Sequence, residues 1–260
     1  MQLTVIGSSG SLSGPQSTAS CYLVEIPGYR PIVMDLGPGS IGRLQRHIDP
    51  GSATVLLSHL HADHCLDMPA LLVWRRFGPH SYSERADVFA PAGADKRIGR
   101  ASAEDAESID DVSDTLAMHE WDPANPVELR NEEGVLAATV RTAKVNHPPL
   151  SYALRFDTPY GASLTYSGDT AFCQDLIDLA TGSDVLLCEA SWEHPGEHPE
   201  GIHMSGLEAG RTAREAGVSL LVLTHIPPWT DADAVEAEAR GEFDGEILVA
   251  TPGLNFALDY

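Results

Sequence analysis

The stretch SHLHADH at residues 58–64 decides how this sequence is interpreted. It directly follows a short apolar run with the composition of a buried strand, so we expect it on the loop that leaves that strand. A loop can turn successive side chains toward two nearby centres, whereas a straight strand or helix cannot. We therefore expect His59 and His61 to face one metal ion while Asp63 and His64 face another.

Three further residues with metal-binding side chains follow aliphatic or β-branched runs, namely His147, Asp169 and His225. Loops at strand ends are held by a rigid scaffold, so active sites gather there. A single histidine after a strand is more often a surface or hydrogen-bonded residue. The cluster at residues 58–64 together with three matched positions favours a metal site instead, and seven ligands would fill two sites.

The chemistry of these side chains predicts the kind of ion. Imidazole and carboxylate ligands without thiolate suit Zn²⁺ best, with Mn²⁺ and Fe²⁺ as alternatives. A single carboxylate such as Asp169 can bridge two cations. The sequence therefore predicts a centre that holds two divalent metal ions.

The rest of the chain alternates predicted strands and helices, which argues for sheets covered by helices. No internal repeat or linker divides it, so residues 1–260 are interpreted as one domain. The expected strands are Leu3–Ile6, Tyr22–Ile26, Ile32–Met34, Val55–Leu57, Leu136–Val145, Leu164–Tyr166, Val185–Cys188 and Leu220–Leu223. The expected helices are Met68–Phe77, Gln174–Ala180, Ser205–Ala216 with Ser205 as N-cap and Gly217 as C-cap, and Asp231–Phe243. The polar segments Pro79–Arg85 and Asp95–Asp114 have weak periodicity and are expected to be surface insertions near the site.

The composition limits the partners that this chain can bind. With 16 Lys and Arg against 38 Asp and Glu, its formal net charge is −22, and such a surface repels a polyanion. Extended RNA or DNA is therefore disfavoured. Two divalent cations in the site would reverse the negative electrostatic field there, which would allow a small phosphate ester to bind.

The four cysteines lack paired spacing, which predicts free thiols that are buried or half-buried. With no export signal and no apolar run of membrane-spanning length, we expect a cytoplasmic protein without a membrane partner, and a homodimer stays open.

The chain resembles the metallo-β-lactamase superfamily over nearly its whole length. The resemblance rests on the 58–64 loop, His147, Ser167-Gly168-Asp169-Thr170 and Thr224-His225, with the glycine-rich stretch Gly7–Gly14 and the turn Asp35-Leu36-Gly37 in support. It implies an α/β fold, the αββα sandwich of two mixed β-sheets flanked by helices. It also implies that Asp35 lies behind the metal ligands.

Within the superfamily the RNase Z-like branch is the most similar, through His203-Met204-Ser205 ahead of a helix. The resemblance implies that His203 reaches the scissile phosphate and assists the leaving oxygen, as a general acid or a phosphate ligand. A capping or surface histidine is the alternative. It also implies that Glu189 orients His203, although a buried structural carboxylate is an open alternative, and that Asp63 orients the nucleophile besides binding metal.

The chain departs from tRNA 3′-end processing enzymes in one respect. Those enzymes commonly carry a long protruding arm between the ligands that correspond to His147 and Asp169, where only a short strand–turn–strand fits here. Lys and Arg supply most non-specific affinity for nucleic acid, so the acidic surface also disfavours tRNA.

Four sequence segments resemble a group of bacterial atypical cyclic-AMP phosphodiesterases. They are LSHLHADHCLDMPALLVWRR, YSGDT, CEASW and LTHIPPWT. That resemblance implies hydrolysis of 3′,5′-cyclic AMP to 5′-AMP.

Three other functions stay open beside that one. They are an RNase Z-like tRNA 3′-processing endonuclease, a glyoxalase II-type thioester hydrolase and a non-catalytic metal-binding protein. A helical glutathione-binding domain, which glyoxalase II enzymes carry, would have little room after His225. Trp192 and Trp229 lie next to predicted site residues and would either stack on a purine or serve ordinary packing.

Overall fold

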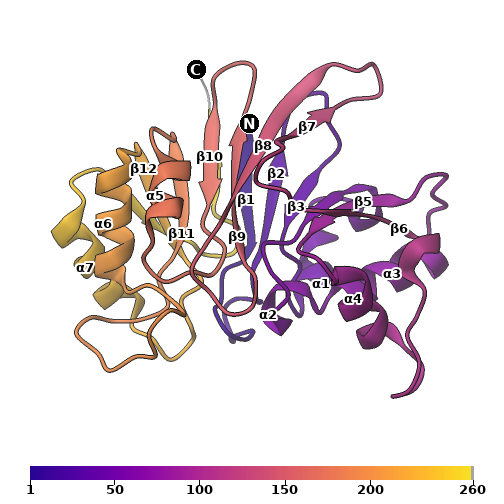
Figure 1. Cartoon of the computed structure of the whole chain (residues 1–260), viewed down its shortest axis with the longest axis horizontal. Coiled ribbons are helices and arrows are strands. Elements are labelled where there is room, and N and C mark those ends of the chain that lie inside the picture. The colour runs from indigo at the N-terminus through magenta and orange to yellow at the C-terminus, as the bar shows by residue number, and fades with distance from the viewer. Residues whose placement is uncertain (259–260) are drawn as a thin grey trace.

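Two seven-stranded mixed sheets pack face to face in the computed structural model, which describes residues 1–258 (Figure 1). The first sheet contains, in spatial order, β14 (Asn255–Ala257), β1 (Gln2–Gly7), β2 (Cys21–Glu25), β3 (Ile32–Met34), β4 (Thr54–Leu56), β5 (Ala86–Ala90) and β6 (Leu116–Glu120). The second contains β13 (Glu246–Val249), β12 (Leu220–Thr224), β11 (Val185–Glu189), β10 (Ser163–Tyr166), β9 (Tyr152–Asp157), β8 (Leu136–Lys144) and β7 (Val127–Arg130).

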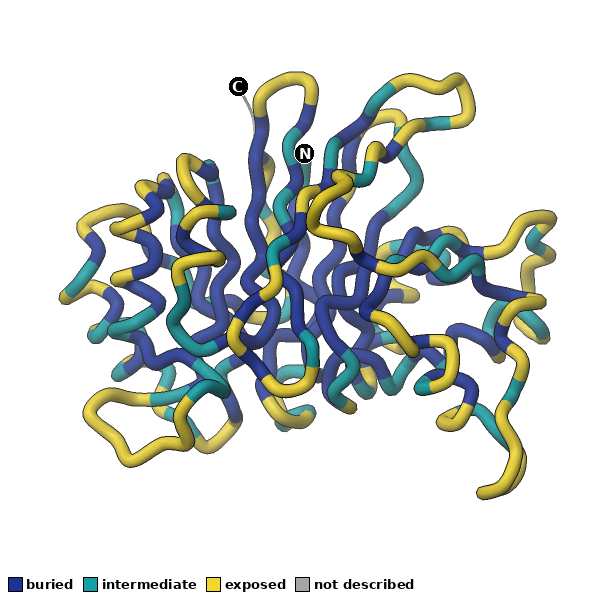
Figure 2. The backbone as a smooth tube through the Cα atoms, in the orientation of Figure 1, coloured by how far each residue is buried: buried dark blue, intermediate teal, exposed yellow. Residues whose placement is uncertain are grey.

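Helices cover the outer faces of both sheets, which completes the predicted αββα sandwich. On the first sheet they are α1 (Ser40–Leu44), α2 (Ala62–Cys65), α3 (Met68–Phe77) and α4 (Ala94–Ser102). On the second they are α5 (Gln174–Ala180), α6 (Gly206–Ala216) and α7 (Ala232–Glu242). Figure 2 shows the sheets as the buried interior of the molecule, with exposed residues concentrated on loops and on outer helix surfaces.

Alternating side chains along each strand build three layers of core. In β1, Val5 packs between the sheets while Ile6 packs against the helices outside. In β11, Leu187 faces the other sheet while Leu186 faces α5 and α6. Successive side chains of a strand point to opposite faces, and here both faces are covered. This double burial explains the continuous apolar runs by which these strands are predicted.

The cap residues of α6 have the conformations that the sequence predicts. Ser205 accepts a hydrogen bond from the backbone N–H of Glu208, whose side chain bonds back to the Ser205 N–H, which is a capping box. Gly217 ends the helix with a φ of 65°, a left-handed conformation that costs glycine little. Gly206 and Gly210 let α6 lie directly against the backbone of α7, because a Cβ at either position would overlap carbonyl oxygens there.

The interpretation of residues 95–114 as an irregular insertion is wrong in part. Residues 94–102 form α4, and Val112–Asp114 form a short 3-10 turn. The guanidinium of Arg76 in α3 binds Asp110 at 2.7 Å and Asp114 at 2.8 Å, which ties the segment to the helix layer. The sequence pattern also does not reveal β5, β6, β7, β13, β14 and the two short helices α1 and α2. These elements have three to five residues each, and each contains a charged or strongly polar side chain, unlike the equally short apolar runs of β3 and β4.

The ends of the parallel strands position the candidate site. Strands β3 to β6 run parallel in the first sheet and β10 to β13 in the second, and the loops after β4, β10 and β12 meet at one end of the sandwich (Figure 1). Across residues 1–258, none of the helices is long and apolar enough to cross a membrane. All four cysteines are free, three of them buried and Cys173 half-buried.

Candidate metal centre

The seven predicted ligands lie together at this end of the sandwich. His59 follows β4, and His61 precedes the short helix α2, which carries Asp63 and His64. His147 follows β8, Asp169 follows β10 and His225 follows β12. Thus loops from both sheets, which lie as far apart in the chain as His59 and His225, supply one group of side chains.

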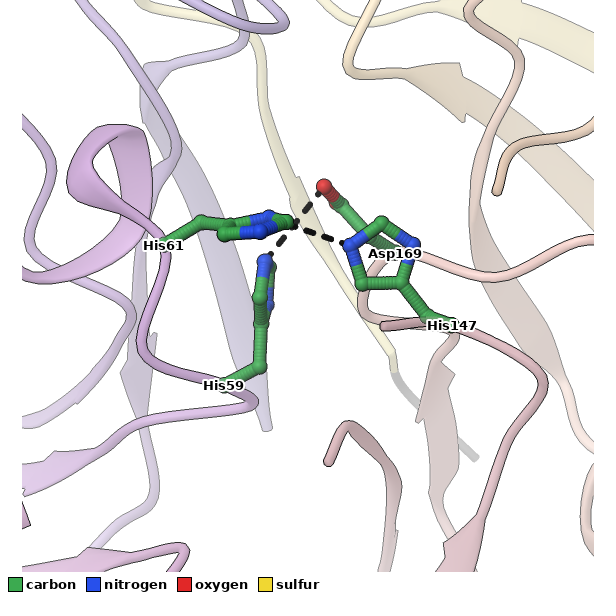
Figure 3. A group of neighbouring side chains, drawn as sticks. All are labelled: His59, His61, His147 and Asp169. Carbon is green, nitrogen blue, oxygen red and sulfur yellow. Dashed lines mark hydrogen bonds and ion pairs between the residues drawn. The ribbon is translucent and has the colours of Figure 1, made fainter. Parts of the chain in front are cut away.

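The side chains form two groups that share one carboxylate. The first comprises His59, His61, His147 and Asp169, and one donor atom from each lies within 4.8 Å of all the others (Figure 3). The second comprises Asp63, His64, Asp169 and His225 by the same criterion. His59 and His61 thus lie in one group and Asp63 and His64 in the other, and Asp169 belongs to both.

Two features of the site fit bound cations. His59 Nε2 and Asp169 Oδ1 are buried and have no hydrogen-bond partner among residues 1–258, which is costly unless another ligand satisfies them. Ring nitrogens also face each other in pairs. His64 Nε2 lies 3.1 Å from His225 Nε2, and His147 Nε2 lies 3.1 Å from His61 Nδ1. Ring nitrogens that converge in this way can bind one divalent metal ion once they are deprotonated.

The electrostatics favour ligand-ready protonation states. Burial lowers the pKa of His59, His61 and His147, so these rings stay neutral and keep a lone pair. Burial opposes ionisation of Asp169, but the neighbouring His225 and His64 outweigh it and lower its pKa well below the usual range. The first group therefore offers three neutral imidazoles and one carboxylate anion.

The second group carries a proton that a metal ion would displace. Burial opposes protonation of His64, yet the carboxylates of Asp169 and Asp35 outweigh it and raise the pKa of His64 well above the ordinary value. Likewise, hydrogen bonds from His225 and His64 outweigh the burial of Asp63 and lower the pKa of its carboxyl group. A cation that replaces the proton would keep these contacts favourable.

Asp35 supports His64 from behind, as the resemblance implies. Its carboxylate accepts hydrogen bonds from the Ser58 N–H at 2.7 Å, the Ser58 hydroxyl at 2.8 Å and the Tyr166 hydroxyl at 2.7 Å. It also lies 2.8 Å from His64 Nδ1, which leaves His64 Nε2 for the second group. Both Asp35 (φ 55°) and His225 (φ 57°) adopt left-handed conformations, which are uncommon for residues other than glycine and accumulate at functional sites.

His203 and Glu189 form a pair at the edge of this centre. His203 Nδ1 lies 2.9 Å from Glu189 Oε1 and 4.0 Å from Asp169 Oδ2. Burial opposes protonation of His203, but Glu189 outweighs it and raises the pKa of the imidazole to about 9. Glu189 is fully buried and accepts hydrogen bonds from the Thr170 and Met204 N–H groups at 2.6 and 3.3 Å, so its position is fixed. His203 itself is half-buried, with 13 % of its side chain exposed.

The two tryptophans named in the sequence analysis differ in their surroundings. Trp192 stacks on His198 with centroids 4.5 Å apart and meets the His203 ring edge-on at 5.3 Å. Trp229 is 65 % exposed on the loop after β12. Trp192 therefore makes ordinary packing contacts with these two histidine rings.

The hydroxyl of Ser191 lies 2.9 Å from His225 Nδ1 and supports that ring. Sequence reasoning missed this serine, because no local pattern marks a serine that supports a ligand.

Comparisons with known proteins agree with this geometry. The model for the beta-lactamase superfamily domain matches residues 30–226. The chain is 50 % identical over 247 residues to an uncharacterized protein of Mycobacterium tuberculosis, covering 95 % of this chain and 88 % of that protein. It is 28 % identical over 258 residues to a ribonuclease Z of a Mycobacterium species, covering 92 % of this chain and 89 % of the relative.

The crystal structure of the metallo-beta-lactamase fold protein YhfI from Bacillus subtilis superimposes with a TM-score of 0.83 at 25 % identity, and the match covers 98 % of each chain. By its fold and its clusters of histidine and aspartate side chains, the protein is a metal-dependent hydrolase. The chain belongs to the beta-lactamase superfamily, in which the metallo-β-lactamase fold implies divalent metal ions.

Loading the centre should stabilise the fold. A ligand that binds the folded state alone at 100 times its dissociation constant adds about 2.7 kcal/mol to the free energy of unfolding. We expect chelator-treated protein to unfold at a temperature several degrees lower than protein with two equivalents of Zn²⁺, as measured by differential scanning calorimetry. Equal unfolding temperatures would contradict two metal sites.

Proposed function

We propose that this protein is a dinuclear metal-dependent phosphodiesterase that hydrolyses 3′,5′-cyclic AMP to 5′-AMP. The observation that supports the proposal is the pair of His203 and Glu189, which lies at the edge of the metal centre 4.0 Å from Asp169 and offers an imidazole as a general acid. The likeness of four sequence segments to bacterial atypical cyclic-AMP phosphodiesterases supports the choice of substrate. The seven ligands named above would hold the two ions, Zn²⁺ by preference and Mn²⁺ or Fe²⁺ as alternatives.

Two divalent cations, when bound, supply Lewis acidity to the phosphoryl group and lower the pKa of water in the site. The chain's own residues then orient and move protons. Asp63, whose carboxylate remains ionised, accepts a hydrogen bond from the attacking water and aims its oxygen at phosphorus. Because His203 Nδ1 is engaged by Glu189, its Nε2 is the atom that faces the leaving oxygen.

Every bond and proton of the proposed reaction is accounted for by the substrate, one water and His203. A water oxygen forms a bond to phosphorus, and the bond from phosphorus to O3′ breaks. The proton on His203 Nε2 passes to O3′, and a proton of the attacking water is released to solvent, from which His203 is reprotonated. A positioned general acid contributes about 10²–10⁴-fold to such a reaction. The product is 5′-AMP.

Two features favour a small substrate over tRNA. Between His147 and Asp169 the chain forms only β9, a tight turn at residues 158–162 and β10, so no arm protrudes there. The formal net charge of −22 opposes the phosphate backbone of a long nucleic acid. Because one relative is named a ribonuclease Z, a pre-tRNA is included among the substrates to be tested.

One panel of assays separates these functions. Metal-loaded protein would be incubated with cyclic AMP, cyclic GMP, 2′,3′-cyclic nucleotides, a pre-tRNA and a thioester, each with and without chelator. We expect chelator-sensitive conversion of cyclic AMP to 5′-AMP, identified by chromatography against both AMP isomers. Cleavage of pre-tRNA or of the thioester alone would assign the other function, and 3′-AMP as product would contradict the proposed direction of cleavage.

A further inference from the structure

One hydroxyl joins the second donor group to the pair of His203 and Glu189. Ser191 is fully buried just after β11, and its Oγ lies 2.9 Å from His225 Nδ1 and 3.0 Å from Glu189 Oε2. His225 belongs to the second donor group, whereas Glu189 holds His203 through its other carboxylate oxygen. The hydroxyl therefore stands between a predicted metal ligand and the carboxylate that holds the proposed acid.

The atoms indicate the direction of each hydrogen bond. His225 Nε2 faces Asp63 at 3.1 Å and is the nitrogen that would bind an ion, so the ring hydrogen lies on Nδ1 and is donated to Ser191 Oγ. The single hydroxyl proton then has two acceptors at 3.0 Å, Glu189 Oε2 and the His225 carbonyl oxygen. A carboxylate is the stronger acceptor of the two, so the hydroxyl donates to Glu189.

Ser191 has little to replace it on either side of this link. Among residues 1–258, its hydroxyl is the one hydrogen-bond partner of His225 Nδ1. Glu189 Oε2 has one further donor, the Met204 N–H at the longer distance of 3.3 Å. Loss of the hydroxyl would leave the N–H of His225 buried without an acceptor, which is costly, and one side of the carboxylate weakly held.

The backbone around Ser191 holds the hydroxyl in this place. The Ala190 N–H donates to the Thr224 carbonyl oxygen at 2.9 Å, which joins the ends of β11 and β12. The Ser191 carbonyl oxygen accepts a hydrogen bond from the Thr230 hydroxyl at 3.1 Å, on the loop after β12. Because one rotatable bond separates the serine backbone from its oxygen, a fixed backbone also positions the hydroxyl.

We propose that Ser191 is a positioning residue that couples the second donor group to the acid. It keeps the hydrogen of His225 on Nδ1, so that Nε2 is free for an ion, and it holds Glu189 in the orientation that presents His203. The inference rests on the proposed function, because His203 is the acid of that reaction. Loss of this one hydroxyl should therefore weaken metal binding and acid catalysis together.

Two serines at opposite ends of β11 provide a matched pair of variants. Ser183 precedes the strand, is also buried, and shares a hydrogen bond of 2.7 Å with the Thr165 hydroxyl. Alanine at either position removes one buried hydroxyl, but only Ser191 lies beside the metal centre. Ser191→Cys keeps nearly the size of the side chain and replaces the hydroxyl by a weak donor, so it should behave as Ser191→Ala does and serves if the alanine variant does not fold.

Titration with Zn²⁺ against a competing chelator tests the metal side of the link without turnover. Ser191→Ala should bind one of its two equivalents about 10- to 100-fold more weakly than the wild type, the usual effect of losing a hydrogen-bond partner of a metal ligand. Ser183→Ala should bind both as the wild type does. Wild-type affinity for both equivalents in folded Ser191→Ala or Ser191→Cys would overturn the assignment.

Leaving groups test the acid side of the link. At saturating Zn²⁺, Ser191→Ala should lower kcat for cyclic AMP, whose O3′ departs with a proton, and spare kcat for bis(p-nitrophenyl) phosphate, whose leaving group needs none. In a His203→Ala background it should cause no further loss for cyclic AMP. Equal losses on both esters, or an additive loss in the double variant, would overturn the coupling. If the wild type cleaves only the nitrophenyl ester, the cyclic-AMP function fails, while the Zn²⁺ titration still decides whether Ser191 supports His225.

Discussion

Replacing Asp169 by asparagine should abolish both metal binding and hydrolysis. Asp169 belongs to both donor groups, so one substitution removes an anionic ligand from each ion. The amide is neutral and cannot bridge two cations through its nitrogen, which leaves the three imidazoles of the first group without an anionic ligand and the second group with the carboxylate of Asp63 alone. We expect bound metal to fall from two equivalents to below one. Turnover should fall on the order of 10⁴-fold or more, beyond the loss of one acid–base group.

The matched control is Asp184→Asn. Asp184 is another carboxylate that is fixed by local hydrogen bonds, from the Ser163 N–H and hydroxyl at 2.7 Å each, but it lies at the opposite end of β10 and β11. It should change stability without changing metal content, as measured by plasma emission spectroscopy after gel filtration. Two equivalents of metal retained in Asp169→Asn would show that the groups do not share this carboxylate.

The donor residues could be predicted from the sequence because the signal is local. Four of them lie within six positions, namely His59, His61, Asp63 and His64. Asp169 and His225 each follow an apolar run that forms a strand buried on both of its faces. The same burial made the central strands visible as continuous hydrophobic runs. The structure brings these side chains into two groups that share Asp169, and their role as metal ligands stays a prediction.

The supporting contacts could not be predicted, because they join residues far apart in the chain. Tyr166 donates to Asp35 across 131 positions, and Ser191 meets His225 across 34. Nothing in the sequence near a tyrosine or a serine indicates such a partner. The edge strands were missed for a different reason. In β6 the burial declines from Leu116 to an exposed Glu120, so it has no alternating pattern that distinguishes it from a loop.

His203 has two candidate roles, as a general acid and as a metal ligand. His203 is absent from the two donor groups that share Asp169, and its Nδ1 is held by Glu189. His203, Glu189 and His225 do form a third cluster of the kind that could hold an ion. Metal content and turnover therefore have to be measured on the same variant, because a ligand would change both and an acid only the second.

Replacing His203 by alanine should lower kcat for cyclic AMP about 10²–10⁴-fold while two equivalents of metal stay bound. The loss follows because O3′ would then depart without a proton. His194→Ala, an exposed histidine of the same loop, is the matched control and should keep full activity. Added imidazole should restore part of the activity of His203→Ala, which a merely structural role would not allow. Full activity would refute the role as acid, and loss of metal would make His203 a ligand of the third cluster instead.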